Sequence, residues 1–284
     1  MIRIFVALLC LLWLGSAVAT CNDDADRARR EGRIEASIQI LQGCLSENLG
    51  KVARSYLLLG IANYEKHDQV AAIENYTRAI ATVPNYPSAF TNRGLSKAVS
   101  HDFKGAIADL DQALALDPKN LHARYFRGFT WTLEKKHANA VDDYSAALEL
   151  ATTKADRKLI LFRRGLEYAA LDNKDDALAD FTAAIGIDPS YARAYFARAT
   201  LLENRGDKDG ALADYSRVIE LDPANAEARY RRGSIYKSER KDRLAVADYN
   251  QAVKLNPHML KARFGRSFIF LLPILPVLFV LALG

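Results

Sequence analysis

The sequence predicts an all-α protein, a solenoid of stacked helix–turn–helix repeats, and three regularities among its 284 residues support this prediction. Small residues recur at intervals of 34, 34, 37, 34 and 34, at Gly60, Gly94, Gly128, Gly165, Ala199 and Gly233. Each is followed after 12 residues by an alanine and after 16 by a bulky apolar residue: Tyr76, Leu110, Tyr144, Phe181, Tyr215 and Tyr249. After 24 residues a proline follows in five of the six units. Self-similarity at a nearly fixed period indicates a repeat architecture.

Each unit is expected to contain two helices. In the first, bulky residues and the small residue share one stripe, as Tyr56, Leu59 and Gly60 do. A polar turn follows, for example at 204–207, and the second helix carries its alanine and its bulky residue four apart on one face. The small residue lets the second helix approach closely. Proline ends the unit because it cannot continue a helix.

The composition indicates a soluble body between two apolar ends. A charged fraction of 26% excludes a polytopic membrane protein, and an apolar fraction of one half excludes a disordered chain. Residues 1–19 contain 16 apolar residues and residues 268–284 contain 14. The two ends therefore require an explanation separate from that of the repeats.

Residues 1–19 have the layout of a cleaved secretory signal peptide. A basic residue at position 3 precedes an apolar run of eleven, which is too short to span a bilayer, and small residues occupy 17–19. This predicts export, to the periplasm or another extracytoplasmic location. An uncleaved membrane anchor and a lipoprotein attached at Cys21 are the alternatives.

The repeats resemble the tetratricopeptide repeat (TPR), in the variant with Arg before the small residue and Asp before the bulky residue of the second helix. The matching residues include Arg93-Gly94, Asp109-Leu110, Asp117-Pro118, Arg232-Gly233, Asp248-Tyr249 and Asn256-Pro257. The resemblance implies a right-handed solenoid of about six full repeats, one degenerate N-terminal repeat and an incomplete last one. The predicted units are 20–52 (degenerate), 53–86, 87–120, 121–157, 158–191, 192–225 and 226–259, followed by the start of a further repeat at 260–267.

The unit at 121–157 departs from the pattern. It has Thr152 in place of the proline and carries three extra residues around 151–157. We expect this insertion to lengthen the loop before the next repeat.

Regular charges in the repeats predict a ladder of ion pairs. Arginine precedes the small residue in five of the six units, and aspartate precedes the bulky residue of the second helix in the same five. The hypothesis is that these arginines and aspartates pair, either within a unit or between neighbours. The other charges are interspersed in sign, so the net charge of +5 does not predict a nucleic-acid partner.

In the TPR family the first helices line a concave face, with positions 2, 5, 9 and 12 of each unit pointing into it. Here these positions supply an apolar and aromatic stripe, which becomes more polar in the last units. The candidate peptide-binding residues are Leu57, Ile61, Leu95, Tyr125, Phe129, Phe162, Leu166, Phe196 and Tyr230. The alternative is that the aromatic residues at position 5 only pack between helices. Lys at position 5 and Asn at position 9, which bind a C-terminal carboxylate in some members, are absent.

Nothing in the sequence predicts catalysis. The five histidines are scattered without metal-ligand spacing or a partner nucleophile, and no glycine-rich phosphate loop occurs. We therefore expect no enzyme activity, no cofactor and no metal.

Cys21 and Cys44 would lie at neighbouring ends of the first helical hairpin. In an oxidising compartment they could form a disulfide, and two free thiols are the alternative.

The apolar segment at 268–284 carries no charge but contains Pro273 and Pro276. It is interpreted as a membrane-attached tail, as an unusual cap on the last repeat, or as a truncated or frameshifted end. The basic residues before it lie on the wrong side for the positive-inside rule if the body is exported.

These features together predict a non-catalytic scaffold of the bacterial envelope that binds a protein or peptide segment in the groove of the repeats. The alternative is a membrane-attached or lipoprotein-like assembly factor for an envelope complex.

Overall fold

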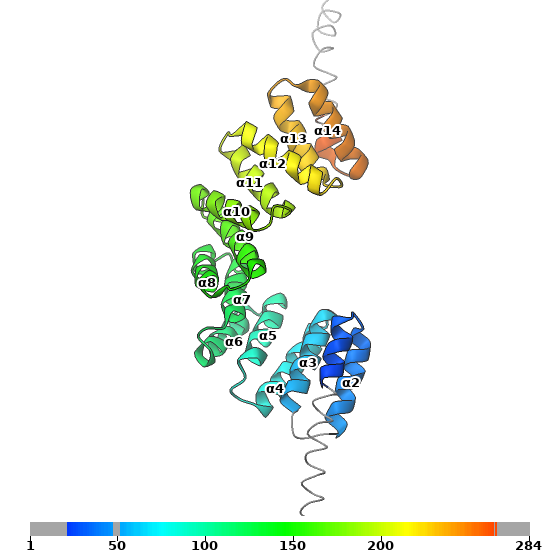
Figure 1. The fold of residues 1–284 in the computed structure, drawn as a ribbon, viewed down its shortest axis with the longest axis vertical. Coiled ribbons are helices and arrows are strands. Elements are labelled where there is room, and N and C mark those ends of the chain that lie inside the picture. The colour runs from blue at the N-terminus through cyan, green and yellow to red at the C-terminus, as the bar shows by residue number, and fades with distance from the viewer. Residues whose placement is uncertain (1–21, 48–51, 264, 266–284) are drawn as a thin grey trace, which may run out of the picture. The chain divides into compact units, whose positions relative to one another are not determined.

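The computed structural model describes residues 22–47, 52–263 and 265, and every regular element in these residues is a helix (Figure 1). The predicted signal peptide at 1–19, Cys21 and the apolar tail at 268–284 lie outside the described residues. The chain divides into two compact units, residues 1–151 and 152–284.

The first unit contains a helix at 22–30 followed by seven longer helices. These are α2 (Ile34–Glu47), α3 (Val52–Glu65), α4 (Gln69–Thr82), α5 (Pro87–Val99), α6 (Phe103–Leu116), α7 (Leu121–Leu133) and α8 (His137–Leu150). The second unit contains α9 (Lys154–Ala170), α10 (Lys174–Ile187), α11 (Ala192–Asn204), α12 (Lys208–Leu221), α13 (Ala226–Ser238) and α14 (Asp242–Leu255). A further short helical stretch begins at 260.

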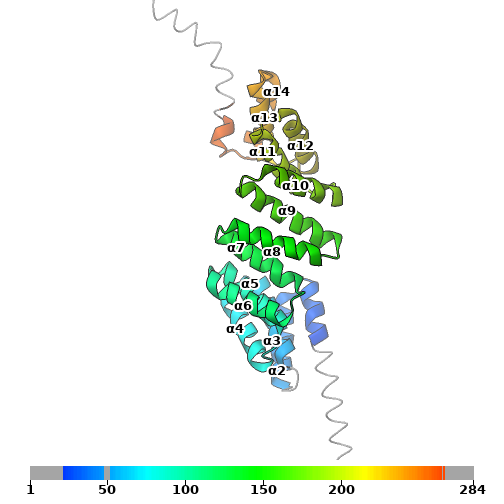
Figure 2. The ribbon, with the colours of Figure 1, turned by 90° about the vertical axis from the view of Figure 1, so that its left-hand side faces the viewer.

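Within each unit the helices form consecutive pairs. The two helices of a pair pack against each other, as α9 and α10 do in Figure 2, and the second helix of a pair also packs on the first helix of the next. The described residues contain seven pairs, the first of them made by the helix at 22–30 and α2. This confirms the predicted all-α stack of helical repeats, including the degenerate one at its N-terminal side.

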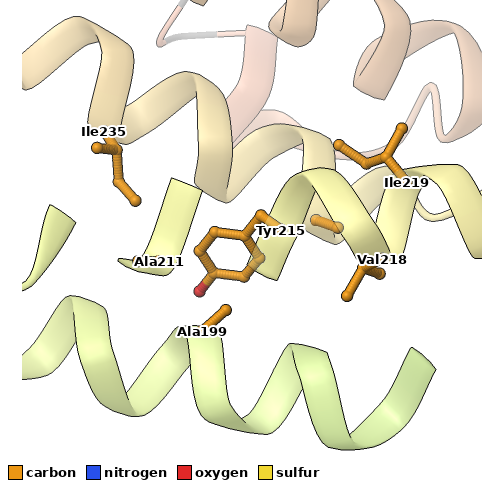
Figure 3. Close-up of a cluster of buried hydrophobic side chains, with 7 residues drawn as sticks. Ala199, Ala211, Tyr215, Val218, Ile219 and Ile235 are labelled. Atoms are coloured by element: carbon orange, nitrogen blue, oxygen red, sulfur yellow. The ribbon is translucent and has the colours of Figure 1, made fainter. Parts of the chain in front are cut away.

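The spacing of small and bulky residues explains the tight packing inside a pair. In α11 and α12, Ala199 lies beneath the ring of Tyr215, and both side chains are fully buried (Figure 3). In α9 the corresponding residue is Gly165, where an added Cβ would lie only 2.7 Å from Cε1 of Phe181. A larger residue at this position would separate the helices or displace the ring.

The turns inside the pairs each contain one residue with a positive φ angle. His67, His101, Lys135, Asp172 and Arg240 have φ angles between 59° and 65°, and Gly206 has 84° at the same place. A left-handed residue ends the first helix and reverses the chain. Two of the seven turns use glycine, the residue that adopts this conformation without steric cost: Gly206 and, in the first pair, Gly32 with a φ of 78°.

The expectation of a longer loop around 151–157 was wrong. The connection between α8 and α9 contains three residues, 151–153, whereas four residues connect α6 to α7, α10 to α11 and α12 to α13. The extra residues instead extend α9 to 17 residues, compared with 13 in α5, α7, α11 and α13. Thr153 caps the extended helix by accepting a hydrogen bond from the Asp156 backbone N–H at 3.0 Å. The division between the two units falls at this connection.

The predicted arginine–aspartate ladder is present. In five repeats the arginine of the first helix binds both carboxylate oxygens of the aspartate sixteen residues later, and these aspartates are about 5% exposed. The pairs are Arg93–Asp109, Arg127–Asp143, Arg164–Asp180, Arg198–Asp214 and Arg232–Asp248.

The same arginines also link neighbouring repeats. Arg198 Nη1 donates to Thr182 Oγ1 at 3.0 Å, and Arg232 Nη1 donates to Ser216 Oγ at 3.0 Å. In the first unit, Arg127 Nη1 binds Asp111 Oδ1 at 2.6 Å. The ladder therefore acts both within a repeat and between repeats.

Candidate functional site

A cavity of about 770 Å³ lies in the second unit, along the first helices α9 and α11 and beside the start of α13. Its apolar lining includes three aromatic rings and several small side chains, and polar groups surround them. The lining residues are Phe162, Leu166, Ala169, Asp172, Lys174, Phe181, Ala192, Arg193, Phe196, Ala197, Thr200, Leu201, Asn204, Asp222, Asn225 and Glu227.

The cavity follows the stripe expected to face the groove. Three of the candidate residues, Phe162, Leu166 and Phe196, line it together. Residues spaced by three and four lie on one side of a helix, so the first helices of consecutive repeats present these positions to a common space. Three of the nine candidate residues therefore share one cavity in the second unit.

The aromatic residues at position 5 also have a packing role. Each stacks against the aromatic residue of the second helix in its own repeat, with ring centroids between 5.6 and 6.0 Å apart. The pairs are Tyr125–Tyr144, Phe162–Phe181, Phe196–Tyr215 and Tyr230–Tyr249. Phe162 is only 3% exposed, so its ring belongs to the core and offers the cavity an edge. The structure therefore shows the packing role of these aromatics, and their contact with a peptide stays a prediction.

The remaining candidate residues do not line this cavity. Leu57 is buried against Tyr76, and Ile61 packs beside the same cluster. Leu95, Tyr125 and Phe129 are half-buried in the first helices of the first unit. Tyr230, in α13, lies under the Lys261 ammonium, whose Nζ is 4.6 Å from the ring centroid.

Most charged groups around the cavity have partners. Lys174 Nζ lies 3.0 Å from Asp172 Oδ1. Glu227 pairs with Arg231 at 3.1 Å and with Lys261 at 2.7 Å. Burial alone would raise the pKa of Glu227, but the hydrogen bond from Lys261 and the two cations outweigh burial and lower it. This carboxylate is therefore ionised and engaged at neutral pH.

Arg193 differs from these groups. Its guanidinium lies over the ring of Phe162, with Cζ 5.2 Å from the ring centroid. In the described part of the chain it makes no ion pair or hydrogen bond, and its side chain is exposed at the cavity.

A hydrogen-bonded chain continues from the cavity toward α13. Tyr215 donates to Glu203 Oε2 at 2.8 Å, and Arg231 Nη1 reaches the same oxygen at 3.3 Å. Burial is the main reason that the pKa of Tyr215 is raised, so its hydroxyl keeps its proton and acts as the donor. This chain fixes the side chain of Glu203 instead of leaving it available to a ligand.

Several lining residues were not among the candidates. Ala169 and Arg193 occupy positions 12 and 2 of their units, so the stripe rule already marked them as facing the groove. Ala197, Asn204 and Asn225 lie off that stripe, and no sequence signal distinguishes them.

The described residues contain no cluster of His, Cys, Asp or Glu able to hold a metal ion. They also contain no helix that is both long and apolar enough to cross a membrane. The disulfide between Cys21 and Cys44 stays a prediction, because Cys21 and the side chain of Cys44 lie outside the part described.

Three family models match the chain, and all of them describe this kind of repeat. A model of the tetratricopeptide repeat matches residues 91–155, and another matches 160–191 and 226–259. A third, described as a TPR repeat, matches 204–238. Together the matches cover more than half of the 284 residues.

Several solved structures share the fold of this chain. YrrB, described as a TPR protein with an unusual peptide-binding site, is 23% identical with a TM-score of 0.58, over 69% of this chain and all of YrrB. PilF from Pseudomonas aeruginosa is 17% identical with a TM-score of 0.67, over 76% of this chain and 97% of its own. The C-terminal part of a TPR protein from Cytophaga hutchinsonii is 17% identical with a TM-score of 0.66, over 86% of this chain and 98% of its own. No curated protein sequence matches the chain.

Proposed function

Since the chain belongs to the tetratricopeptide repeat family, we propose that it is a scaffold that holds a peptide or an extended segment of a partner protein against its first helices. The repeats of this family are non-catalytic, in agreement with the sequence-based expectation that the chain is not an enzyme. Binding of this kind requires a preformed groove and no reacting group.

The observation that carries the proposal is the cavity on α9 and α11. It gathers Phe162, Leu166 and Phe196 from two consecutive repeats, and its volume of about 770 Å³ suits a few side chains of an extended segment. Buried aromatic pairs hold the walls in place, so little conformational entropy is lost when a ligand binds. YrrB, which shares the fold, has a peptide-binding site, and this proposal extends that property to the present chain.

We place this scaffold in the bacterial envelope, on the basis of the signal-like residues 1–19. N-terminal sequencing of the exported protein tests this, because cleavage after residue 19 leaves Thr20 as the first residue. Recovery of the uncleaved chain from the cytoplasm would contradict it.

The apolar segment 268–284 supports a second candidate, a membrane-attached assembly factor of an envelope complex. Fractionation of the full chain beside a chain that ends at Ser267 separates the two. Attachment through the tail requires that only the full chain sediments with membranes. Equal solubility of both chains would exclude the second candidate.

Peptide binding is tested with two matched substitutions in α9. Leu166 lines the cavity, whereas Leu159 lies on the same helix outside the cavity and is 36% exposed. The full chain is immobilised, and a pool of random heptapeptides blocked at both ends is offered to it as ligands. We expect Leu166→Arg to abolish capture of peptides that the wild-type chain retains, and Leu159→Arg to leave capture unchanged. Equal capture by both variants would refute binding in this cavity.

A further inference from the structure

We propose that the cavity recognises a peptide segment in which an acidic side chain, Asp or Glu, stands beside a bulky apolar residue. The inference rests on the proposed function and adds the chemistry of the ligand to it. Arg193 would bind the carboxylate, and the apolar side chain would lie on Phe162, Leu166 and Phe196.

The first argument is the balance of charge around the cavity. Five charged side chains line it, and four are engaged. Asp172 and Lys174 pair with each other, and Glu227 pairs with two cations outside the lining. Asp222 accepts hydrogen bonds from the Ala224 backbone N–H at 3.2 Å and from Asn225 Nδ2 at 3.3 Å.

Arg193 is the fifth charged group, and it differs from the arginines of the ladder. The guanidinium of each ladder arginine binds a buried aspartate, as that of Arg198 binds Asp214. Arg193 has no such acceptor among the described residues, so its N–H groups remain available for a ligand. Arg193 is therefore the one charged side chain of the lining that makes no ion pair or hydrogen bond within the described residues.

The second argument is the position of this guanidinium. Because it lies over the ring of Phe162, one face is shielded and its orientation is restricted. A guanidinium held in this way offers two parallel donors to a carboxylate, which is the arrangement that gives arginine its preference for such groups. The ring beneath it belongs to the apolar lining, so the acidic and the apolar side chain of the ligand must be close in sequence.

The third argument concerns size and source. A cavity of about 770 Å³ encloses a short segment and not a folded domain. Carboxylates occur on Asp and Glu side chains and at a chain end. The residues that bind a C-terminal carboxylate in this family are absent, so we assign the ligand carboxylate to a side chain.

In the test, random heptapeptides with an acetylated N-terminus and an amidated C-terminus are offered to the immobilised full chain. The peptides that it retains are then sequenced. Blocked ends leave side chains as the sole source of carboxylate. We expect Asp or Glu next to Phe, Tyr, Trp, Leu, Ile or Met to be enriched at least about fivefold, the size expected of a charge-assisted contact that is partly exposed.

Charge reversal supplies the specific control. Arg193→Glu is expected to remove the acidic preference and favour Lys or Arg at that place, while Arg193→Lys keeps the preference with weaker binding. Arg243→Glu reverses an exposed arginine of α14 outside the cavity and should change nothing. Thermal melting of each variant checks that its fold is intact.

The outcomes separate the two proposals. Peptide capture without an acidic preference, or a preference that Arg193→Glu leaves unchanged, overturns the inference and leaves the proposed function standing. Absence of any captured peptide overturns both.

Discussion

Arg198 in α11 donates two hydrogen bonds to Asp214 in α12, from Nε to Oδ2 at 2.7 Å and from Nη2 to Oδ1 at 2.8 Å. The aspartate is only 5% exposed and lies beside the fully buried Tyr215. A carboxylate in this position would be costly to bury without its cation, and the cation also reaches Thr182 of the preceding repeat. The pair therefore fixes the register of two helices and of two repeats.

Asp214→Ala should lower the free energy of unfolding by about 2 kcal/mol, because it leaves a partly buried guanidinium without its acceptor. Urea denaturation followed by circular dichroism measures the change. Asp180→Ala should behave alike, since Arg164 binds Asp180 with the same geometry. The control is Asp175→Ala, which breaks an exposed pair with Arg205 and should cost less than about 0.5 kcal/mol. Similar losses for Asp175→Ala and Asp214→Ala would contradict the role of the ladder.

Gly165→Ala should destabilise the protein by about 1–3 kcal/mol, because the added Cβ would lie 2.7 Å from the buried ring of Phe181. Gly186→Ala in α10 is the matched control. There an added Cβ meets nothing within 4 Å, and alanine is the better helix former, so stability should rise by up to about 1 kcal/mol. If the denaturation midpoint falls in Gly165→Ala and rises in Gly186→Ala, this explanation of the 34-residue period is supported. If Gly165→Ala stabilised the protein, the space between the two helices would be large enough for the added Cβ, which would contradict this explanation.

The fold was predictable because these contacts are local and repeated. Gly165 and Phe181 stand sixteen residues apart in the sequence, and the same spacing recurs in every full repeat. A single pair would carry no signal, but six copies do. The pairing of arginine with the aspartate before the bulky residue was predictable for the same reason, in the five repeats that contain both.

The features that the repeat period does not determine were harder to predict from the sequence. The extra residues at 151–157 could lengthen either a loop or a helix, and the capping hydrogen bond at Thr153 favoured the helix. The stripe rule marked Arg193 as facing the groove. Its lack of a counter-ion depends on which neighbouring carboxylates are already engaged, and that follows from tertiary packing.

Arg240→Gly should stabilise the protein by about 0.5–1 kcal/mol. Arg240 has a φ of 61° in the turn between α13 and α14, and its exposed side chain makes no hydrogen bond or ion pair with the described residues. The reciprocal change, Gly206→Ala, forces a Cβ into the same conformation at a φ of 84° and should cost about 1 kcal/mol. Thermal melting of the two variants beside the wild type measures both. A loss of stability in Arg240→Gly would mean that its side chain has a role in the turn.

The ion pair between Lys158 and Asp188 makes a prediction about pH. Lys158 Nζ lies 2.7 Å from Asp188 Oδ2, and this hydrogen bond, with those from Ser190, lowers the pKa of Asp188 to about 2. Lys158→Met should raise this pKa above 2 but not fully to 3.8, because both hydrogen bonds from Ser190 remain. An NMR titration of the Asp188 side-chain carboxyl carbon measures the shift.

The sign of the stability effect follows from the direction of the shift. Because the pKa of Asp188 is lower in the folded chain than in the unfolded one, the pair contributes stability above about pH 4, and this contribution is lost as the pH falls through about 2. The difference in melting temperature between wild type and Lys158→Met should therefore be present at pH 6 and shrink toward pH 2. Lys154→Met removes an exposed lysine of the same helix and should leave the Asp188 titration unchanged. If both variants shift that titration equally, the low pKa is a general effect of positive charge on α9 and the specific pair is not its cause.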